Sequence, residues 1–268
     1  MVHHITSASN PLIKTLKSLH AKKGRTETGL FLAEGARLAL EATDLGVWPE
    51  IMVYAPAALG RPQVRDLVRN AEARDVRVIE SSEAVLAQIS KRDNPQTVIG
   101  AYRQRLTPLE ALTGETVVAL EGVRDPGNLG AILRTADSVG AGGIVLLGES
   151  CDAFSMEAVR ASMGSVFAVK LARASFEDLL RYKRSRGASL IGASLKGAVL
   201  DAEHKFETNA ILLMGNEQSG LTPEMEAACD LLARLPMRGR ADSLNLAVAT
   251  AVMLYELWRR RGYDGARA

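Results

Sequence analysis

The feature that most constrains the fold is a repeated order of short apolar run, polar loop and amphipathic helix. Residues 117–120 form such a run, which predicts a buried strand, and a loop at 125–128 follows it. Apolar residues then recur at helical spacing, at Leu129, Ile132, Leu133, Ala136 and Val139. A second run at 210–214 is followed by the same order of loop and helix. Alternating strands and helices predict an α/β fold.

The loop and helix after the first run contain candidate functional residues. Asn128 is placed to cap the helix, and the N–H groups of a first helical turn favour an anionic ligand. Arg134 lies off the apolar face and shares a helical stripe with Gly130 and Gly127, so a cation stands beside backbone without side chains. Taken alone, the segment is equally compatible with an ordinary turn and a solvated arginine.

A second segment follows the apolar run at 210–214. Gly215 permits close approach of another backbone, and Glu217 places a carboxylate at the strand end. Thr222 and Pro223 then mark the start of another helix. A strand–turn–helix connection with a surface glutamate would give the same pattern.

A third segment, residues 235–245, leads into a long apolar helix at 246–258. Ser243 is placed to cap that helix. Arg238 and Arg240 flank a glycine in the loop, which is compatible with a phosphate contact and also with solvated arginines.

Together the three segments resemble the motifs of the SpoU/TrmH family of RNA ribose 2′-O-methyltransferases, within the knotted SPOUT class. The motifs occur in the family's order, each at a strand end. The matching residues are Asn128, Gly130, Arg134 and Thr135 in the first motif, Gly215, Asn216, Glu217, Ser219, Gly220 and Leu221 in the second, and Pro236, Met237, Gly239, Ser243, Leu244 and Asn245 in the third. Between the first two, Val159–Ser165 is similar to an Arg-Ala-Ser-x-Gly stretch of the family, and Ser194–Gly197 to its Ser-x-x-Gly loop.

The resemblance implies a fold and a domain order. Residues 116–268 would form a knotted (trefoil) SPOUT methyltransferase domain with a parallel sheet. Residues 106–115 would be a linker. Residues 1–105, in which strands and helices also alternate, resemble the small α/β, ribosomal-protein-like domain that binds the RNA substrate in many of these enzymes.

The resemblance also implies S-adenosylmethionine as the cofactor, with no metal. The expected cofactor-binding residues are Ser194, Met214, Gly215, Leu235, Met237 and Leu244. The expected catalytic group is Arg134, Asn128, Glu217, Ser243 and Asn245. An arginine keeps its proton up to a pH of about 12. We therefore expect Arg134 to bind the target phosphate or to stabilise the developing alkoxide, and its action as a base stays open.

The distribution of charge favours RNA as the partner, although the formal net charge is only +2. The first 25 residues contain no acidic residue and five cations, which we expect to contact RNA phosphates: Lys14, Lys17, Lys22, Lys23 and Arg25. A solvated helix face is the alternative explanation of this run. The length of the N-terminal domain favours ribosomal RNA of the large subunit over transfer RNA.

The resemblance further implies a homodimer. The helix at 246–258, with Met253, Leu254, Leu257 and Trp258, is a candidate interface, and packing in the core of one subunit explains it almost as well. The two cysteines have no metal or redox spacing, and neither a secretory signal nor a membrane span is recognisable, so we expect a cytoplasmic protein. The alternatives are a transfer RNA ribose 2′-O-methyltransferase and a non-catalytic RNA-binding protein on the same fold.

Overall fold

The computed structural model describes residues 2–199 and 209–266, and its contacts divide the chain into two units. The first unit comprises Met1–Gln104 and Asp152–Phe167, and the second comprises Arg105–Cys151 and Ala168–Ala268. The sequence-based division assigned residues 152–167 to the methyltransferase domain. In the structure they belong to the first unit, a return of the chain that the sequence pattern did not predict.

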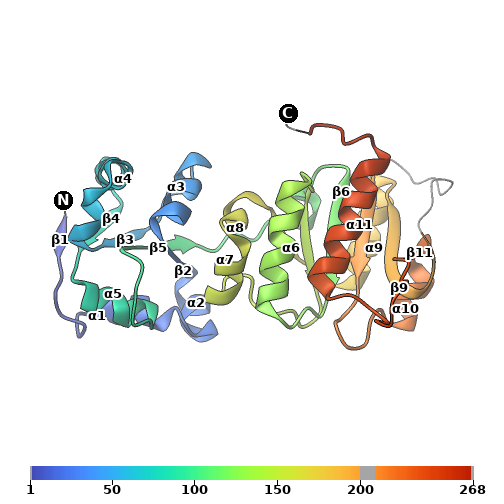
Figure 1. Ribbon diagram of the computed structural model, residues 1–268, viewed down its shortest axis with the longest axis horizontal. Coiled ribbons are helices and arrows are strands. Elements are labelled where there is room, and N and C mark those ends of the chain that lie inside the picture. The colour runs from blue at the N-terminus through green and yellow to red at the C-terminus, as the bar shows by residue number, and fades with distance from the viewer. Residues whose placement is uncertain (1, 200–208, 267–268) are drawn as a thin grey trace. The chain divides into compact units, whose positions relative to one another are not determined.

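The described part of the first unit holds a five-stranded mixed sheet in the order β1-β4-β3-β5-β2 (Figure 1). In chain order its elements are β1 (His3–His4), α1 (Pro11–Ser18), α2 (Lys22–Thr28), β2 (Leu30–Glu34), α3 (Ala36–Asp44), β3 (Ile51–Tyr54), η1 (Pro56–Gly60), α4 (Pro62–Glu72), β4 (Arg77–Glu80), α5 (Glu83–Ser90), β5 (Val98–Arg103) and α7 (Met156–Ser162). β1, β4 and β3 pair in parallel, whereas β5 is antiparallel to both β3 and β2.

Helices cover both faces of this sheet because side chains along each strand alternate in direction. In β3, Ile51 and Val53 pack against residues of α1 and α5. Met52 and Tyr54 point to the other face and pack against residues of α3 and α4. The result is the small α/β layer structure expected from the sequence.

The described part of the second unit holds a six-stranded sheet in the order β11-β9-β10-β6-β7-β8, and all of its pairings are parallel. In chain order its elements are η2 (Leu109–Ala111), β6 (Thr116–Glu121), α6 (Pro126–Ser138), β7 (Gly143–Leu147), β8 (Leu171–Arg173), α9 (Phe176–Arg186), β9 (Ser189–Val199), β10 (Ala210–Met214), α10 (Pro223–Ala228), β11 (Leu231–Arg234) and α11 (Leu246–Arg260). The short helix α8 (Ser165–Ala168) lies where the chain passes from the first unit to the second.

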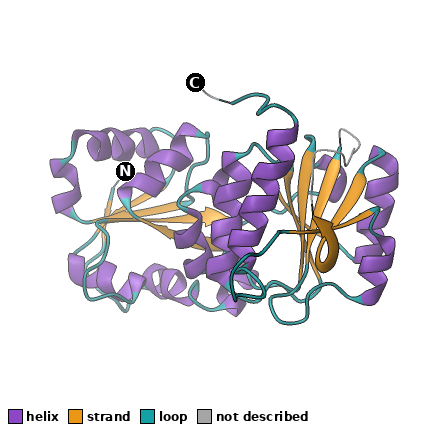
Figure 2. Cartoon of the chain, turned by 45° about the vertical axis from the view of Figure 1, so that its right-hand side comes forward, coloured by secondary structure: helices purple, strands orange, loops and turns teal. Residues whose placement is uncertain are grey.

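This parallel sheet is covered on both faces, which explains why its central strands read as continuous apolar runs. Helices α6 and α11 lie side by side over one face, and α9 and α10 lie over the other (Figure 2). Every residue of β7 and β10 is buried. The parallel sheet predicted from the sequence is therefore confirmed.

The start of helix α6 differs from the prediction in one functional detail. The N-cap is Asp125, whose carboxylate accepts a hydrogen bond from the backbone N–H of Asn128 at 2.7 Å. Pro126 occupies the first helical turn, where its missing N–H costs nothing. The predicted capping role of Asn128 is therefore wrong, and its side chain is available for other contacts.

Helix α11 also begins at a different cap from the one predicted. Asn245, not Ser243, caps it, because the Asn245 side-chain oxygen accepts from the N–H groups of Ala247 at 2.9 Å and Val248 at 3.3 Å.

No helix among residues 2–199 and 209–266 is long and apolar enough to cross a membrane.

Three of the four residues of α11 suggested as a dimer interface lie in the core of the unit, whereas Trp258 is half-buried and its indole N–H donates to the carbonyl of Asp264 at 2.9 Å. Met253 and Leu254 are each 1% exposed and Leu257 is 3% exposed. Core packing, the alternative left open by the sequence, accounts for them. The exposed apolar side chains of this helix are instead Val248, Val252 and Tyr255.

Candidate active site

The three motifs meet at the carboxyl edge of the second sheet. Glu217 follows β10 and Asn128 lies in the first turns of α6 after β6, and these two strands are parallel neighbours. The Asn128 side-chain amide donates to Glu217 Oε1 at 3.3 Å. Asn245, at the start of α11, donates through its own amide to Asn128 Oδ1 at 2.9 Å. One residue from each motif therefore joins a single hydrogen-bonded chain.

Glu217 holds the β6–α6 loop as well as Asn128. Its two carboxylate oxygens accept from the backbone N–H groups of Arg124 at 3.3 Å and Asp125 at 3.5 Å. The preceding residue, Asn216, donates from its amide to the carbonyl of Gly122 at 2.7 Å. The second motif thus fixes the backbone that leads to Arg134.

Gly215 is required by the loop itself. The backbone of Asn216 pairs with that of Gly220, which folds the loop back on the end of β10. A Cβ on Gly215 would lie 2.2 Å from the Gly220 carbonyl carbon and 2.5 Å from the Leu221 nitrogen. The close backbone approach predicted at Gly215 exists, and in the structure its partner is residues 220–221 of the same loop.

Arg134 is exposed on α6, two turns beyond Asn128. Among the described residues, no hydrogen bond or ion pair to its guanidinium is present, so its donors are not committed within the described part of the chain. Ser243 is also exposed, and within the described chain no hydrogen bond joins it to Asn128, Glu217 or Asn245. The structure therefore connects three of the five predicted catalytic residues directly and leaves the side chains of Arg134 and Ser243 open.

Arg124 is a residue that the motif comparison missed. It is exposed beside the loop that Glu217 holds, and no partner of its guanidinium is found in the described part of the chain. Arg238 and Arg240 are exposed and similarly without a described partner. The signal available in the sequence was the position of Arg124 directly before the capping Asp125.

The predicted cofactor-binding residues lie on or after three adjacent strands, β11, β9 and β10. Ser194 lies within β9, Met214 and Gly215 lie at the end of β10, and Leu235, Met237 and Leu244 follow β11. The ladder between β9 and β11 is interrupted, because Leu232 pairs with Gly192 and the next residue pairs with Ala198. Residues 193–197, which include the predicted Ser194, therefore stay within β9 but bulge out of its ladder with β11.

Ser194 and Lys196 are both held by Glu226 of α10. Ser194 Oγ donates to Glu226 Oε1 at 2.8 Å, and the Lys196 ammonium lies 2.8 Å from Oε2. The hydrogen bonds from Lys196 and Ser194 keep the pKa of Glu226 below its usual range. Because the Ser194 hydroxyl is hydrogen-bonded to Glu226, a ligand would contact the backbone groups of Ser194.

The remaining cofactor candidates differ in what they expose. Met214 is 3% exposed and its side chain belongs to the core, whereas Met237 and Leu244 are each 39% exposed. Leu235 is half-buried. Exposed apolar side chains beside backbone groups at strand ends suit a ligand with an apolar ring and polar edges.

In the described residues, no group of three or more His, Cys, Asp or Glu side chains is placed to hold a metal ion.

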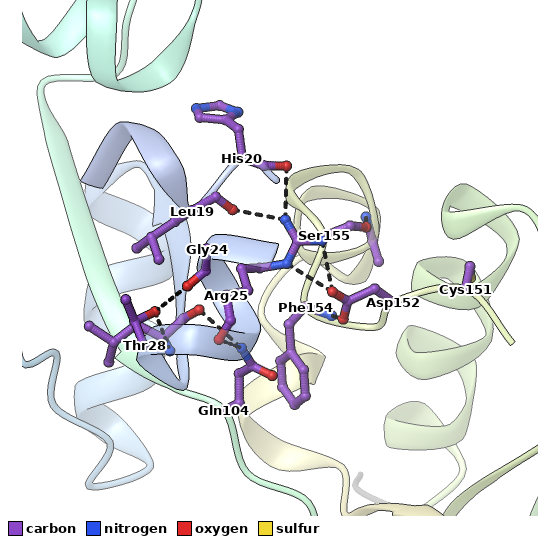
Figure 3. Close-up of polar contacts among 12 residues, drawn as sticks. Leu19, His20, Gly24, Arg25, Thr28, Gln104, Cys151, Asp152, Phe154 and Ser155 are labelled. Carbon is purple, nitrogen blue, oxygen red and sulfur yellow. Dashed lines mark hydrogen bonds and ion pairs between the residues drawn. The ribbon is translucent and has the colours of Figure 1, made fainter. Parts of the chain in front are cut away.

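The basic N-terminal residues are divided by the structure. Lys14, Lys22 and Lys23 are exposed, and Lys17 donates to the Gln88 side chain at 3.2 Å. Arg25 is only 4% exposed, and its guanidinium is used entirely within the first unit (Figure 3). The expectation that Arg25 contacts RNA is therefore wrong, because a buried and fully paired cation does not reach a phosphate.

Comparison with known proteins assigns the family. The sequence model of the SpoU rRNA methylase family matches residues 115–255. The chain belongs to this family. Residues 10–100 match the MRM3-like substrate binding domain. The resemblance drawn from the three motifs is thereby confirmed, and with it the expected enzyme class of RNA ribose methyltransferases.

Individual relatives cover nearly the whole chain. The chain is 31% identical to the 23S rRNA (guanosine(2553)-2′-O)-methyltransferase RlmP of Bacillus subtilis, over 94% of this chain and 98% of that protein. It is 28% identical to the 23S rRNA (uridine(2479)-2′-O)-methyltransferase of Streptomyces viridochromogenes, over 88% and 85%. A crystal structure of an rRNA methyltransferase from Sinorhizobium meliloti with bound S-adenosylmethionine is 47% identical, covers 96% of this chain and 98% of its own, and has a TM-score of 0.87. The expected cofactor and the expected α/β fold, a parallel-sheet methyltransferase domain preceded by a substrate-binding domain, are confirmed.

The two loop glycines of the second and third motifs provide a matched test of the cofactor edge. Gly215→Ala forces the backbone of residues 215–221 to move, whereas a Cβ on Gly239 meets nothing within 4 Å. We expect Gly215→Ala to weaken S-adenosylmethionine binding by about tenfold or more, because it displaces this loop, and Gly239→Ala to leave the binding unchanged. A loss of about 1.4 kcal/mol in binding free energy is enough for a tenfold weaker affinity. Isothermal titration calorimetry measures both. Equal affinities in the two variants would show that the folded-back loop does not shape the cofactor site.

Proposed function

We propose that this chain transfers a methyl group from S-adenosylmethionine to a ribose 2′-hydroxyl of RNA, with large-subunit ribosomal RNA favoured over transfer RNA. The observation that carries the proposal is the hydrogen-bonded chain Asn245–Asn128–Glu217, which brings one residue of each family motif to one edge of the sheet. The 23S rRNA substrates in the names of the relatives support ribosomal RNA. We place this activity in the cytoplasm.

The residues at the carboxyl edge fit S-adenosylmethionine. Backbone groups of the bulge in β9 and at the ends of β10 and β11 would bind its polar edges, and the exposed side chains of Met237 and Leu244 would contact its adenine. When bound, the cofactor supplies an electrophilic methyl group on a sulfonium. We propose that the trefoil knot of the class is formed here, where residues 235–245 lead from β11 back to Asn128 at the end of β6.

The chain's own residues then have to position and activate the ribose. The guanidinium of Arg134 would bind the adjacent phosphate or stabilise negative charge developing on the 2′-oxygen. Asn128, Glu217 and Asn245 would fix the loop and the helix start that carry Arg134. Ser243, exposed in the third motif, would contact the ribose directly. Correct positioning of two reactants alone supplies a large part of such a rate enhancement.

The first unit would hold the RNA. Lys14, Lys22 and Lys23 are exposed on α1 and α2, and Lys17 is partly exposed, so their ammonium groups can replace counterions of the phosphate backbone. The match of residues 10–100 to a substrate binding domain supports this assignment.

A direct assay tests the function. Purified protein is incubated with tritiated S-adenosylmethionine and either unmodified large-subunit ribosomal RNA or bulk transfer RNA. We expect label in the ribosomal RNA, recovered as a 2′-O-methylnucleoside after digestion. Label only in transfer RNA would show that the substrate is transfer RNA and not ribosomal RNA. Cofactor binding without methyl transfer to either RNA would favour the non-catalytic RNA-binding alternative.

Substitution of Arg134 tests its role. Arg134→Ala should reduce kcat by about a hundredfold to a thousandfold, the usual loss on removing one preorganised donor to a developing oxyanion, with the Kd for S-adenosylmethionine unchanged. Arg134→Lys should not restore the rate, because the planar guanidinium fork is lost. Arg184→Ala, at an exposed position on α9, is the matched control. An Arg134→Ala variant with a tenth of the normal rate would rule out this role.

We further propose that the chain works as a homodimer through the exposed stripe on α11. Val248, Val252 and Tyr255 are 48%, 44% and 43% exposed and lie three or four residues apart on one face of the helix. Val252 and Tyr255 also border a hollow of about 520 Å³ that includes Leu235, a predicted cofactor residue. An apolar stripe that adjoins the cofactor edge would let a second copy complete the site.

A charge placed in the stripe tests the dimer. In a two-fold dimer each substitution occurs twice, so Val252→Asp buries two unpaired carboxylates and should convert the protein to a monomer. Ser185→Asp, on the exposed side of α9, should leave the mass unchanged. Sedimentation equilibrium at micromolar concentration measures both variants, and a monomeric wild-type protein would contradict the proposal.

A further inference from the structure

Residues 152–167 belong to the first unit although they lie between two strands of the second. The chain leaves the second sheet after β7 and returns to it at β8. The segment contains helix α7 and the Arg-Ala-Ser-x-Gly stretch at 160–164. The proposed active site uses no residue of that stretch, since each of its groups lies in the second unit.

Arg25 and Asp152 form the first anchor of this segment (Figure 3). Arg25 Nε donates to Asp152 Oδ2 at 2.8 Å and Nη2 lies 2.7 Å from the same oxygen. Arg25 Nη1 donates to the carbonyls of Leu19 at 2.8 Å and His20 at 2.9 Å, after the end of α1. The arginine therefore links the start of the 152–167 segment to the N-terminal helices, and it does so in a buried position.

Glu34 and Arg160 form a second anchor on the edge strand β2. Arg160 Nη2 donates to Glu34 Oε2 at 2.7 Å, and the Glu34 side chain is only 1% exposed. Glu34 Oε1 and Arg160 Nε are buried without a partner among the described residues. A buried ion pair with unsatisfied atoms contributes little net stability, and the best-attested use of such pairs is to select one arrangement of the chain.

Packing completes the attachment. Phe154 lies 5.1 Å from Phe31 of β2, measured between ring centroids, and Phe167 lies 4.8 Å from Tyr102 of β5. Gly164, at φ +104°, lies against the Glu41 carboxylate so closely that a Cβ would overlap Oε2. Both ends and the middle of the segment are thus fixed to the first unit.

We propose that the 152–167 segment is a tether, with Arg25, Glu34, Asp152 and Arg160 as positioning residues that couple RNA held by the first unit to the methyltransferase site. The chain crosses between the units after residues 104, 151 and 167, so attachment of this segment to the first unit joins the units by three covalent connections in place of one. A restricted tether raises the effective concentration of the bound ribose at Arg134. This inference rests on the proposed function.

Substitutions on the segment itself test the tether without altering residues 1–104. Asp152→Asn removes the charge that Arg25 binds, and Arg160→Met removes the partner of Glu34. Arg103→Met is the matched control, because Arg103 pairs with Glu50 in the same unit at an exposed position. Hydrogen exchange of the wild-type protein and the three variants, followed by mass spectrometry, reports the attachment directly.

We expect peptides within 152–167 to exchange about tenfold faster in Asp152→Asn and Arg160→Met, and strands β6 and β10 to exchange as in the wild type. Arg103→Met should exchange like the wild type throughout. Unchanged exchange in both segment variants would overturn the anchoring, whether or not the protein methylates RNA, so this outcome is separate from the failure of the proposed function.

Single-turnover kinetics with unmodified large-subunit ribosomal RNA distinguish a tether from a purely structural element. Loss of the tether should lower the rate of methyl transfer by about tenfold while the Kd values for RNA and S-adenosylmethionine stay within about twofold of the wild type. A rise in the Kd for RNA with an unchanged rate would show that the segment only stabilises the RNA-binding unit. A wild-type rate in variants whose segment exchanges faster would also overturn the coupling.

Discussion

The geometry of the site depends on the side-chain amide of Asn128, which bonds in two directions at once. It donates to Glu217, 89 residues away, and accepts from Asn245, 117 residues away. The amide can do this because it carries both a donor nitrogen and an acceptor oxygen, whereas a carboxylate lacks the donor and an ammonium lacks the acceptor. The three motifs are therefore held together by the two ends of one side chain.

The parallel sheet makes this contact possible, and the helix caps make the amide available for it. Neighbouring parallel strands end at the same edge, so the loops after β6 and β10 start within reach of each other. Asp125 supplies the cap of α6 and leaves the Asn128 side chain unused by its own helix. Asn245 caps its own helix and also contacts Asn128, because its side-chain oxygen caps α11 while its side-chain nitrogen donates to Asn128.

Much of this arrangement could be predicted from local sequence. Strands and helices of the second unit follow from periodicity, and the motifs identify most of the residues at its carboxyl edge. The cap of α6 was misassigned because Asp125 and Asn128 are both good capping residues. Pro126 distinguishes them, since a proline in the first turn places the cap directly before it.

Contacts between distant residues could not be predicted in the same way. Arg25 stands in a run of exposed lysines, and its burial follows from Asp152, 127 residues further along the chain. The assignment of residues 152–167 to the first unit has the same cause. Periodicity and local charge describe a residue's neighbours in sequence, whereas these positions are set by partners that only the folded chain brings near.

The partners that folding brings near a residue also decide which charges of the protein can act on RNA. A formal net charge of +2 counts Arg25 and Arg160 equally with Arg134, yet the first two are committed to buried or half-buried carboxylates. A cation committed to a buried ion pair is not available to replace a counterion of RNA, so it adds little to affinity. Arg124 and Arg134 at the active-site edge, and Lys14 and Lys22 in the first unit, are exposed and without described partners, and these are charges that a phosphate backbone can use. The electrostatic attraction for RNA is therefore set by which cations the fold leaves unpaired, and the net charge is a poor guide to it.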